Sequence, residues 1–178
     1  MKKMIFTPSP ISGEVRVPAS KSQAHRALIC AALAGGSIVL DVDLSDDITA
    51  TAEALRSFGA ELVYDPEKRS FKSGPPLDGS IDAGEIYCGE SASTLRFLIP
   101  LAAALGTRAV FTGGGRLPKR TTELYKPLLE AHGAKLSYSG NGDFLPLEVS
   151  GKLEPGVYCL RGDVSSQFVT GLLISLAG

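Results

Sequence analysis

The chain has 178 residues, 44% of them hydrophobic and 21% charged, with a formal net charge of −1. This is the composition of a globular protein, and the near-neutral charge gives no basic field for nucleic acid or an anionic membrane. The three cysteines lack CxxC or Cys/His spacing, which excludes a disulfide framework and a zinc site. No secretory signal or membrane span is recognisable, so a cytoplasmic location is expected.

In chain order, the first predicted elements are a short strand over 15–17 and a helix over 27–34 that is apolar on almost every side. A helix without a polar face is typical of a domain interior. Gly35 is expected to cap this helix, and a β-rich run follows over 37–42.

An amphipathic helix is predicted next, ending at Gly59. Ser45 and the two carboxylates after it are interpreted as the start of this helix. Its apolar stripe consists of Ile48, Ala52 and Leu55. An alternating strand over 61–64 follows, before a turn at Asp65-Pro66.

A second and a third set of elements follow the same plan. The second consists of a strand over 86–88, an apolar helix closed by Gly106, a strand over 109–112, a helix ending at Gly133 and a strand over 135–138. Pro127 falls inside the last of these helices and is expected to kink or delay it. The third set begins with a strand over 157–160 and another apolar helix.

This order reflects an internal repeat. Gly35, Gly106 and Gly178 end the same small-residue motif and lie 71 and 72 residues apart. Tyr87-Cys88 returns as Tyr158-Cys159. Several matches in register are hardly due to chance, and a period of this kind indicates stacked structural units.

We therefore predict an α/β fold of repeated βαβαββ units with buried helices and outer sheets. Two complete units would occupy about 18–85 and 86–156, and the start of a third would occupy 157–178. Because the third unit stops after its first helix, we interpret the chain as a fragment.

Each unit places hydroxyl-bearing residues at the start of its apolar helix. The three segments are 20–26, 89–96 and 162–167. The unpaired N–H groups and positive dipole end of a helix N-terminus bind anions. If the three helices are parallel, their N-termini meet at one end of the domain and share a ligand.

The serines in these segments are equally suited to be helix N-caps, and for any single segment that is the stronger interpretation. It does not explain Lys21 and Arg26, because cations oppose the dipole at a helix N-terminus. Two arginines so placed, Arg26 and Arg96, indicate a partner anion. Burial against a carboxylate is an equal alternative for Arg96.

Five other residues are ambiguous from sequence alone. Arg120 follows a triple-glycine turn without Walker A spacing, and a solvated loop residue is the more common interpretation. His25 and His132 are interpreted as surface or capping residues. Cys88 and its counterpart Cys159 are assigned to packing in equivalent strands, with Cys88 beside a site loop and open to modification.

At these residues the sequence resembles the 5-enolpyruvylshikimate-3-phosphate synthase family. The matching motifs are Pro18–Ser22 with Arg26, Cys88–Arg96, Arg116–Arg120 and Gly162–Phe168. The resemblance implies a transferase that moves the enolpyruvyl group of phosphoenolpyruvate to the 5-hydroxyl of shikimate 3-phosphate and releases phosphate. This is a step of the shikimate pathway to chorismate and the aromatic amino acids, and it needs no metal or organic cofactor.

The resemblance also implies roles for individual residues. Lys21 would act in catalysis and reach both substrates, and Gln167 would contact both. Shikimate 3-phosphate would also be held by Ser22, Arg26, Ser165 and Ser166. Phosphoenolpyruvate would face the backbone at Ala92 and the guanidinium of Arg120.

Other implications concern the whole protein, which in this family is more than twice as long and acts as a monomer. The acid–base carboxylates would lie outside this chain, so the chain alone is expected to be inactive. Residues 1–17 would form a strand of the other domain, joined by a hinge near 18–20. Two departures stand out: Ala92 replaces a Gly found in glyphosate-sensitive members, and Thr121 replaces a frequent Pro. The added methyl predicts glyphosate tolerance.

Two alternatives remain open from the sequence. One is the sister transferase that acts on UDP-N-acetylglucosamine, although the serines and Gln167 favour shikimate 3-phosphate. The other is a non-catalytic anion-binding module.

Overall fold

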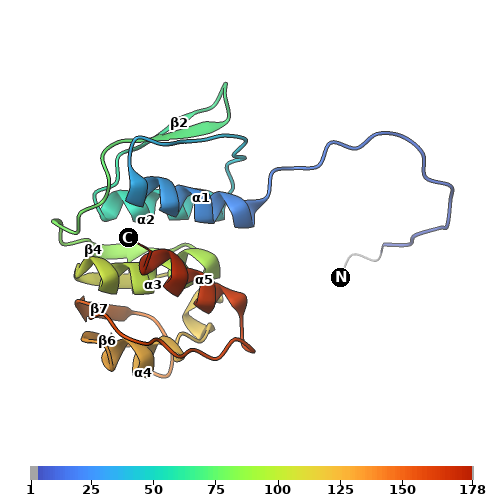
Figure 1. Ribbon diagram of the computed structural model, residues 1–178. Coiled ribbons are helices and arrows are strands. Elements are labelled where there is room, and N and C mark those ends of the chain that lie inside the picture. Colours follow the sequence, from blue (N-terminus) through green and yellow to red (C-terminus); the bar gives the residue numbers. More distant parts are fainter. Residues whose placement is uncertain (1–3, 178) are drawn as a thin grey trace.

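The computed structural model describes residues 4–177 as an α/β structure with two sheets, each covered on one face by helices (Figure 1). The second repeat unit is complete and has the predicted βαβαββ order. Its elements are β4 (Gly84–Tyr87), α3 (Ala92–Leu105), β5 (Ala109–Thr112), the 3₁₀ turn η1 (Leu117–Lys119), α4 (Tyr125–Glu130), β6 (Ala134–Tyr138) and β7 (Leu147–Gly151).

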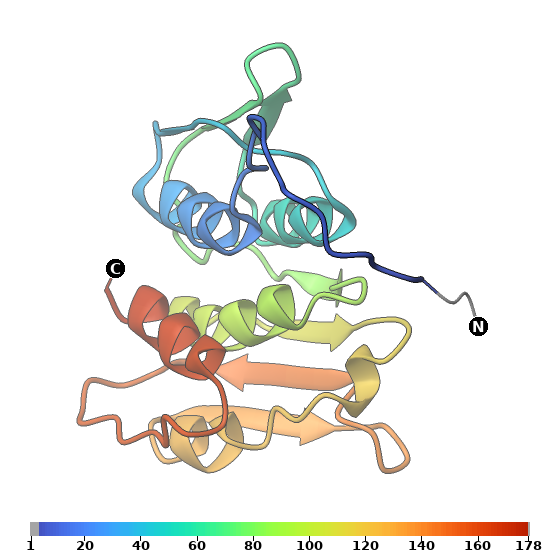
Figure 2. The ribbon, with the colours of Figure 1, turned by 90° about the vertical axis from the view of Figure 1, so that its right-hand side faces the viewer.

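The sheet of this unit is mixed. Its strand order is β4-β5-β7-β6, with β4 and β5 parallel and the other pairs antiparallel. The parallel pair requires a crossover connection, and α3 provides it. Figure 2 shows the four strands side by side, with α3 and α4 on one face.

The first unit repeats this plan without its first strand. It contains α1 (Lys21–Ala34), β1 (Ile38–Val39), α2 (Asp46–Ser57), β2 (Leu62–Asp65) and β3 (Ser70–Ser73). Its antiparallel sheet has the order β1-β3-β2, which corresponds to β5-β7-β6 of the second unit. The position beside β1 that corresponds to β4 is empty among the described residues.

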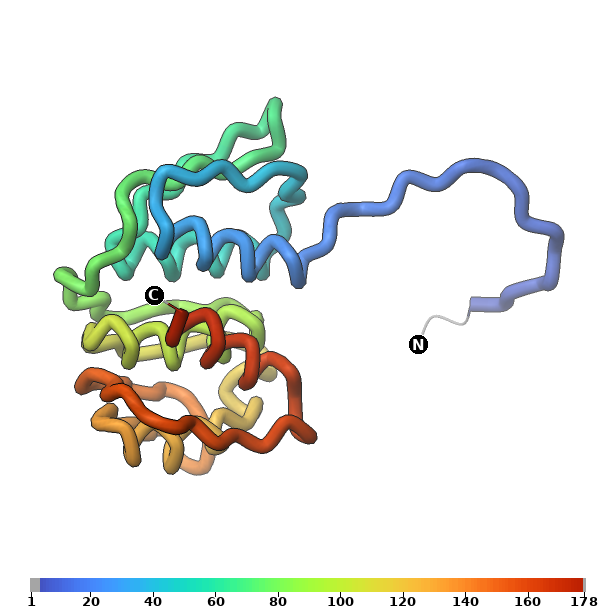
Figure 3. The backbone as a smooth tube through the Cα atoms, in the orientation of Figure 1, coloured from blue at the N-terminus to red at the C-terminus, as the bar shows by residue number. Residues whose placement is uncertain are grey.

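Two predicted strands are not formed, and a third is shortened. Residues 15–17 belong to an extended, exposed arm over 4–18 that runs away from the sheets (Figure 3). Residues 157–160 also form no strand, because no described strand follows α5 to pair with them as β5 pairs with β4. The run over 37–42 shortens to β1, since Asp41 has a φ of 54° and interrupts it.

The predicted helix ends are confirmed. Gly35 and Gly106 cap α1 and α3 with φ values of 65° and 74°, a conformation that favours glycine. Gly59 and Gly133 follow α2 and α4 with nearly equal φ values of 96° and 95°, as expected for repeat partners. The third glycine of the motif, Gly178, lies outside the described residues.

Pro127 delays α4 and does not kink it. The helix begins at Tyr125, so Pro127 lies in the first turn, where its missing N–H would have no helical acceptor. The predicted stripe of α2 faces the core, with Ile48, Ala52 and Leu55 all buried.

The helix α3 forms the centre of the molecule, with every residue from Thr94 to Ala103 buried. Its interior Pro100 cannot donate to the carbonyl oxygen of Arg96 one turn earlier. The hydroxyl of Tyr125 donates to that oxygen instead, at 2.7 Å. The last helix, α5 (Ser166–Ser175), packs against α3. None of the helices described is long and apolar enough to cross a membrane.

Candidate functional site

The three apolar helices begin with the same cap. The hydroxyls of Ser20, Ser91 and Ser165 accept hydrogen bonds from backbone N–H groups in the first turns of α1, α3 and α5, at 3.4, 3.2 and 3.3 Å. These serines are therefore N-caps, as the simpler interpretation expected. The serines that follow them, Ser22, Ser93 and Ser166, do not cap the helices.

The helices α1, α3 and α5 run parallel, and their N-termini lie at one end of the molecule (Figures 1 and 3). A cavity of about 490 Å³ opens between these ends. It is lined by Ser22, Arg26, Ser93, Arg96, Phe97, Arg120, Val164, Ser165, Ser166 and Gln167. The predicted convergence of the three segments is confirmed by this shared lining.

The cavity lining contains three arginines and no carboxylate. The Arg26 guanidinium donates to the Ser22 carbonyl oxygen at 2.6 Å and to the Thr170 hydroxyl at 3.4 Å, so it joins α1 to α5. It also lies 5.4 Å from the centre of the Phe97 ring, which holds it by a cation–π contact. Arg120 follows η1 and brings a third guanidinium to the same space.

Arg96 is the most unusual of the three because it is buried, with 8% of its surface exposed. Its guanidinium donates to Gln167 Oε1 at 2.7 Å and to the Thr121 carbonyl oxygen at 3.2 Å, and it stacks on Phe168. Its Nε has no hydrogen-bond partner. All of these contacts are neutral, so the alternative of a carboxylate partner is wrong.

Burial, and then the positive charge of Arg120, lowers the pKa of the Arg96 guanidinium. A buried charge without a counterion costs free energy, and a bound anion would offset that cost. The cavity is therefore suited to a multiply charged anion.

Gln167 connects the two sides of the cavity. Its Oε1 accepts from Arg96, and its Nε2 donates to the Ser93 hydroxyl at 2.8 Å. Because donor and acceptor are both engaged, the orientation of this amide is fixed. The side chain therefore ties the start of α5 to the start of α3.

Two residues expected at the site do not line this cavity. The Lys21 ammonium forms an ion pair with Asp47 at 2.7 Å, with 56% of the Lys21 side chain exposed. Asp47 lies in the first turn of α2, where a carboxylate also suits the helix dipole. Ala92 is the first residue of α3 and is half-buried.

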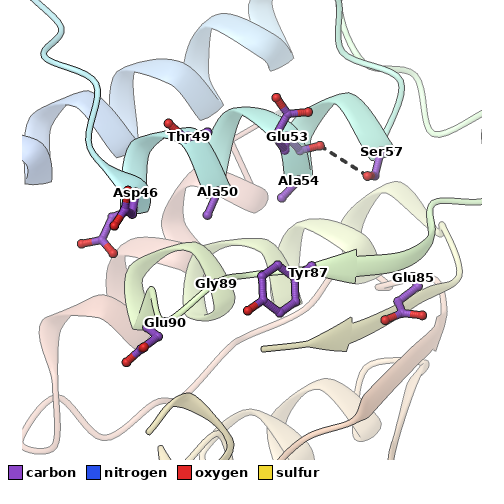
Figure 4. A pocket seen from close by; sticks show the side chains of 11 residues that line it. Asp46, Thr49, Ala50, Glu53, Ala54, Ser57, Glu85, Tyr87, Gly89 and Glu90 are labelled. Carbon is purple, nitrogen blue, oxygen red and sulfur yellow. Dashed lines mark hydrogen bonds between the residues drawn. The ribbon is translucent and has the colours of Figure 1, made fainter. Parts of the chain in front are cut away.

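A larger cleft of about 680 Å³ lies between α2 and β4 (Figure 4). Its charged lining is acidic and consists of Asp46, Asp47, Glu53, Glu85 and Glu90. A similar cleft lies between α4 and residues 157–161, at the equivalent position of the next unit. Clefts at this position therefore recur where one repeat unit meets the next. The acidic lining of the larger cleft disfavours the binding of anions.

Comparison with known proteins agrees with this geometry. A sequence profile of the family described as EPSP synthase (3-phosphoshikimate 1-carboxyvinyltransferase) matches residues 5–178. The chain belongs to the EPSP synthase family.

Relatives named 3-phosphoshikimate 1-carboxyvinyltransferase include those of Clostridium kluyveri and Clostridium perfringens, 45% and 41% identical over 99% of this chain. The solved EPSP synthase of Acinetobacter baumannii matches with a TM-score of 0.79 and 27% identity over 92% of this chain. The chain spans 41% of the length of these two relatives and 37% of the solved chain.

The expectation for His25 is wrong, whereas for Cys88 the packing role is confirmed and only the expected openness to modification is wrong. His25 is 2% exposed and its Nδ1 lies 2.7 Å from the Thr51 hydroxyl, so it is neither a surface nor a capping residue. Cys88 is fully buried, and burial raises the pKa of its thiol to about 12, which disfavours modification. Its counterpart Cys159 is exposed and lies outside any strand.

His132 is half-buried and stacks on Tyr158 with ring centres 3.9 Å apart. Three further residues, Ser93, Thr51 and Thr94, were not predicted from the sequence. Ser93 could have been found as the repeat counterpart of the serines after the other two caps. The two threonines carry no such signal, because only packing brings them together.

Proposed function

We propose that the whole protein transfers the enolpyruvyl group of phosphoenolpyruvate to the 5-hydroxyl of shikimate 3-phosphate and releases phosphate. Membership of the EPSP synthase family and the names of the relatives support this reaction. The observation that carries the proposal is the cavity itself, in which three guanidiniums and several hydroxyls converge without a carboxylate.

In this proposal the cavity residues hold the shikimate 3-phosphate. The groups in question are Ser22, Arg26, Ser165, Ser166 and Gln167. Arg120, the backbone at Ala92 and the ammonium of Lys21 would face phosphoenolpyruvate, and Lys21 would act in catalysis. Lys21 would then exchange its ion pair with Asp47 for the substrates.

Electrostatics explain why so many donors are needed. Each substrate carries a phosphate and a carboxylate, and two unit charges about 4 Å apart repel by about 4 kcal/mol at an effective dielectric constant near 20. Converging guanidiniums offset this repulsion. Donors fixed in advance, such as the Gln167 amide, then stabilise charge that shifts during the reaction.

We further propose that residues 18–178 form a repeat domain and that residues 1–17 belong to another domain of the whole protein. The exposed arm over 4–18 and the empty position beside β1 support this division. The whole protein would act as a monomer in the cytoplasm, with the second domain closing over the cavity.

The test is a titration of the ¹⁵N-labelled chain with shikimate 3-phosphate, followed by ¹H–¹⁵N NMR. We expect weak binding, with a dissociation constant of about 1 mM or above, because only one wall of the site is present. The amide signals of Ser22, Ser166 and Gln167 should shift. UDP-N-acetylglucosamine should produce no shifts at these positions.

Ser166→Ala removes one cavity hydroxyl and should weaken binding by about tenfold. Ser57→Ala is the matched control, because Ser57 lines the acidic cleft and donates only to the Glu53 carbonyl oxygen. Shifts confined to the acidic cleft, or equal affinities of both variants, would contradict the proposal.

Glyphosate tolerance of the whole protein stays a prediction, tested by inhibition competitive with phosphoenolpyruvate in proteins with Ala92 and with Ala92→Gly.

A further inference from the structure

A chain of buried hydrogen bonds lies behind the anion cavity and joins three helices. It runs from His25 Nδ1 on α1 to the Thr51 hydroxyl on α2 at 2.7 Å, and from there to the Thr94 hydroxyl on α3 at 2.6 Å. It ends at the hydroxyl of Ser91, the N-cap of α3, at 2.8 Å. We refer to His25, Thr51, Thr94 and Ser91 as the relay; all four are at most 3% exposed.

The proton positions in the relay follow from its geometry. With the Thr94 hydroxyl donating to Ser91, the Thr51 hydroxyl donates either to Thr94 or to the Asp47 carbonyl oxygen, 3.1 Å away on its own helix. In both arrangements Thr51 uses its only hydroxyl proton and accepts from the imidazole. Nδ1 of His25 therefore carries a proton and donates.

The last residue of the relay, Ser91, lies at the N-terminus of α3, the helix that carries the cavity residues Ser93 and Arg96. Ser91 caps α3 by accepting from the Thr94 N–H at 3.2 Å, and Ser93 and Arg96 lie within the next two turns. Ser93 and Arg96 both hold the Gln167 amide. A shift of the α3 N-terminus would therefore move all three cavity groups together.

We propose that His25 is a positioning residue that acts through Thr51 and Thr94 to fix the start of α3 and thereby the anion-binding groups of the cavity. This rests on the proposed function, because that function makes the cavity the substrate site. His25 itself does not line the cavity. Its contribution is to supply the donor that orders the relay.

The surroundings of His25 favour a neutral ring with its proton on Nδ1. The charged groups that act on it are Lys21 and Arg26 of its own helix and Asp47 of α2, and the Phe97 ring of α3 lies against it with ring centres 6.4 Å apart. Burial and the two cations disfavour a second proton, and Asp47 opposes them only in part. The relay therefore keeps one direction across neutral pH.

The first experiment determines the state of His25 in the unaltered chain. Two-bond ¹H–¹⁵N correlation spectra of ¹⁵N-histidine report which ring nitrogen is protonated. The relay requires a neutral ring with the proton on Nδ1 at pH 7. A proton on Nε2 alone, or a doubly protonated ring, would overturn the proposal without any variant.

The second experiment compares Thr51→Val with Thr51→Ser. Valine has the shape of threonine but can neither accept from His25 nor donate to Thr94, whereas serine can do both. We expect Thr51→Val to weaken the binding of inorganic phosphate by about tenfold and to shift the amide signals of Ser93, Arg96 and Gln167. Thr51→Ser should restore both.

Thr49→Val on the same helix is the matched control, because Thr49 is exposed and outside the relay. Equal phosphate affinity of Thr51→Val and the unaltered chain would overturn the proposal. If the unaltered chain binds neither phosphate nor shikimate 3-phosphate, the proposed function fails, and the ring state and the amide signals still decide the relay. If Thr51→Val does not fold, the same comparison is made between His25→Leu and His25→Asn, whose amide keeps a donor near Nδ1.

Discussion

At the scale of single residues, the serines show what sequence can and cannot resolve. Cap and ligand are competing interpretations of each serine-rich segment. The cap is confirmed for Ser20, Ser91 and Ser165, and the ligand role of the cavity serines stays a prediction. The capping position is fixed by local geometry, whereas Ser22 and Ser166 face the cavity because of where three helices meet. Ser165 takes part in both, since it caps α5 and lines the cavity. The residue type predicted hydroxyl groups at the helix N-termini, and the packing of the three helices decides which of these hydroxyls line the cavity.

The three cysteines should differ in reactivity. Cys30 and Cys159 are exposed, whereas Cys88 is fully buried and burial raises the pKa of its thiol to about 12. Because the thiolate is the reactive form, a maleimide should label Cys30 and Cys159 in the native chain and Cys88 only after unfolding. Peptide mass spectrometry of labelled samples measures this. Native labelling of Cys88 would show that the start of α3 opens readily.

His25 predicts a dependence of stability on pH. Burial lowers the pKa of His25 from 6.5 to about 4 in the folded chain. Between these values the unfolded chain binds the proton and the folded chain does not, so the free energy of unfolding decreases as pH falls. The full loss is about 3 kcal/mol, complete near pH 4, and stability is greatest above pH 6.5.

Urea unfolding at pH 4.5, 5.5 and 7 measures this dependence, with His25→Asn as the control. The amide of asparagine does not titrate, so the variant should lose much less stability over the same interval. Equal losses in both proteins would assign the dependence to other groups.

At the scale of elements, the helices were predictable and the strands less so. A buried helix satisfies its own backbone, so an apolar run closed by glycine at Gly35 or Gly106 is sufficient to predict one. A strand needs a neighbour, and the sequence does not reveal whether one is present. The side-chain pattern of a strand, alternating or apolar, is present in residues 15–17 and 157–160. Neither segment pairs with another strand among the described residues.

Tyr125 supplies a hydrogen-bond donor that is missing inside another element, the helix α3. Pro100 leaves the Arg96 carbonyl oxygen inside α3 without a helical donor, and the buried Tyr125 hydroxyl donates to it at 2.7 Å. Tyr125→Phe should therefore lower the free energy of unfolding by about 1–3 kcal/mol. Tyr87→Phe should change it little, because Tyr87 is 61% exposed.

A double-mutant cycle identifies the cause of the Tyr125→Phe effect. Pro100→Ala returns an N–H to α3 that can donate to the Arg96 oxygen. In that background, Tyr125→Phe should cost clearly less in urea unfolding than it does alone. An unchanged cost would mean that the hydroxyl acts mainly through its second contact, the Phe168 carbonyl oxygen at 2.9 Å.

At the scale of the whole molecule, the repeat made the fold and the cavity predictable. A period of 71 or 72 residues implies that the apolar helices are equivalent, so their N-termini point the same way and bring the three segments together. The relay and the neutral surroundings of Arg96 were not predictable, because they join residues between units. Thr51 and Thr94 meet only because α2 packs against α3.

The N-terminal arm should be dispensable for the stability of this chain. Residues 4–18 are exposed throughout, and the large apolar side chains among them, such as Phe6 and Ile11, are 82% and 97% exposed. Side chains that remain in water contribute little to folding. A variant beginning at Pro18 should therefore keep the urea midpoint and the m value of the 178-residue chain, and it should bind shikimate 3-phosphate equally well. A clear loss of stability would mean that the arm packs against the repeat units in solution, in which case the empty position beside β1 is the first place to look for it.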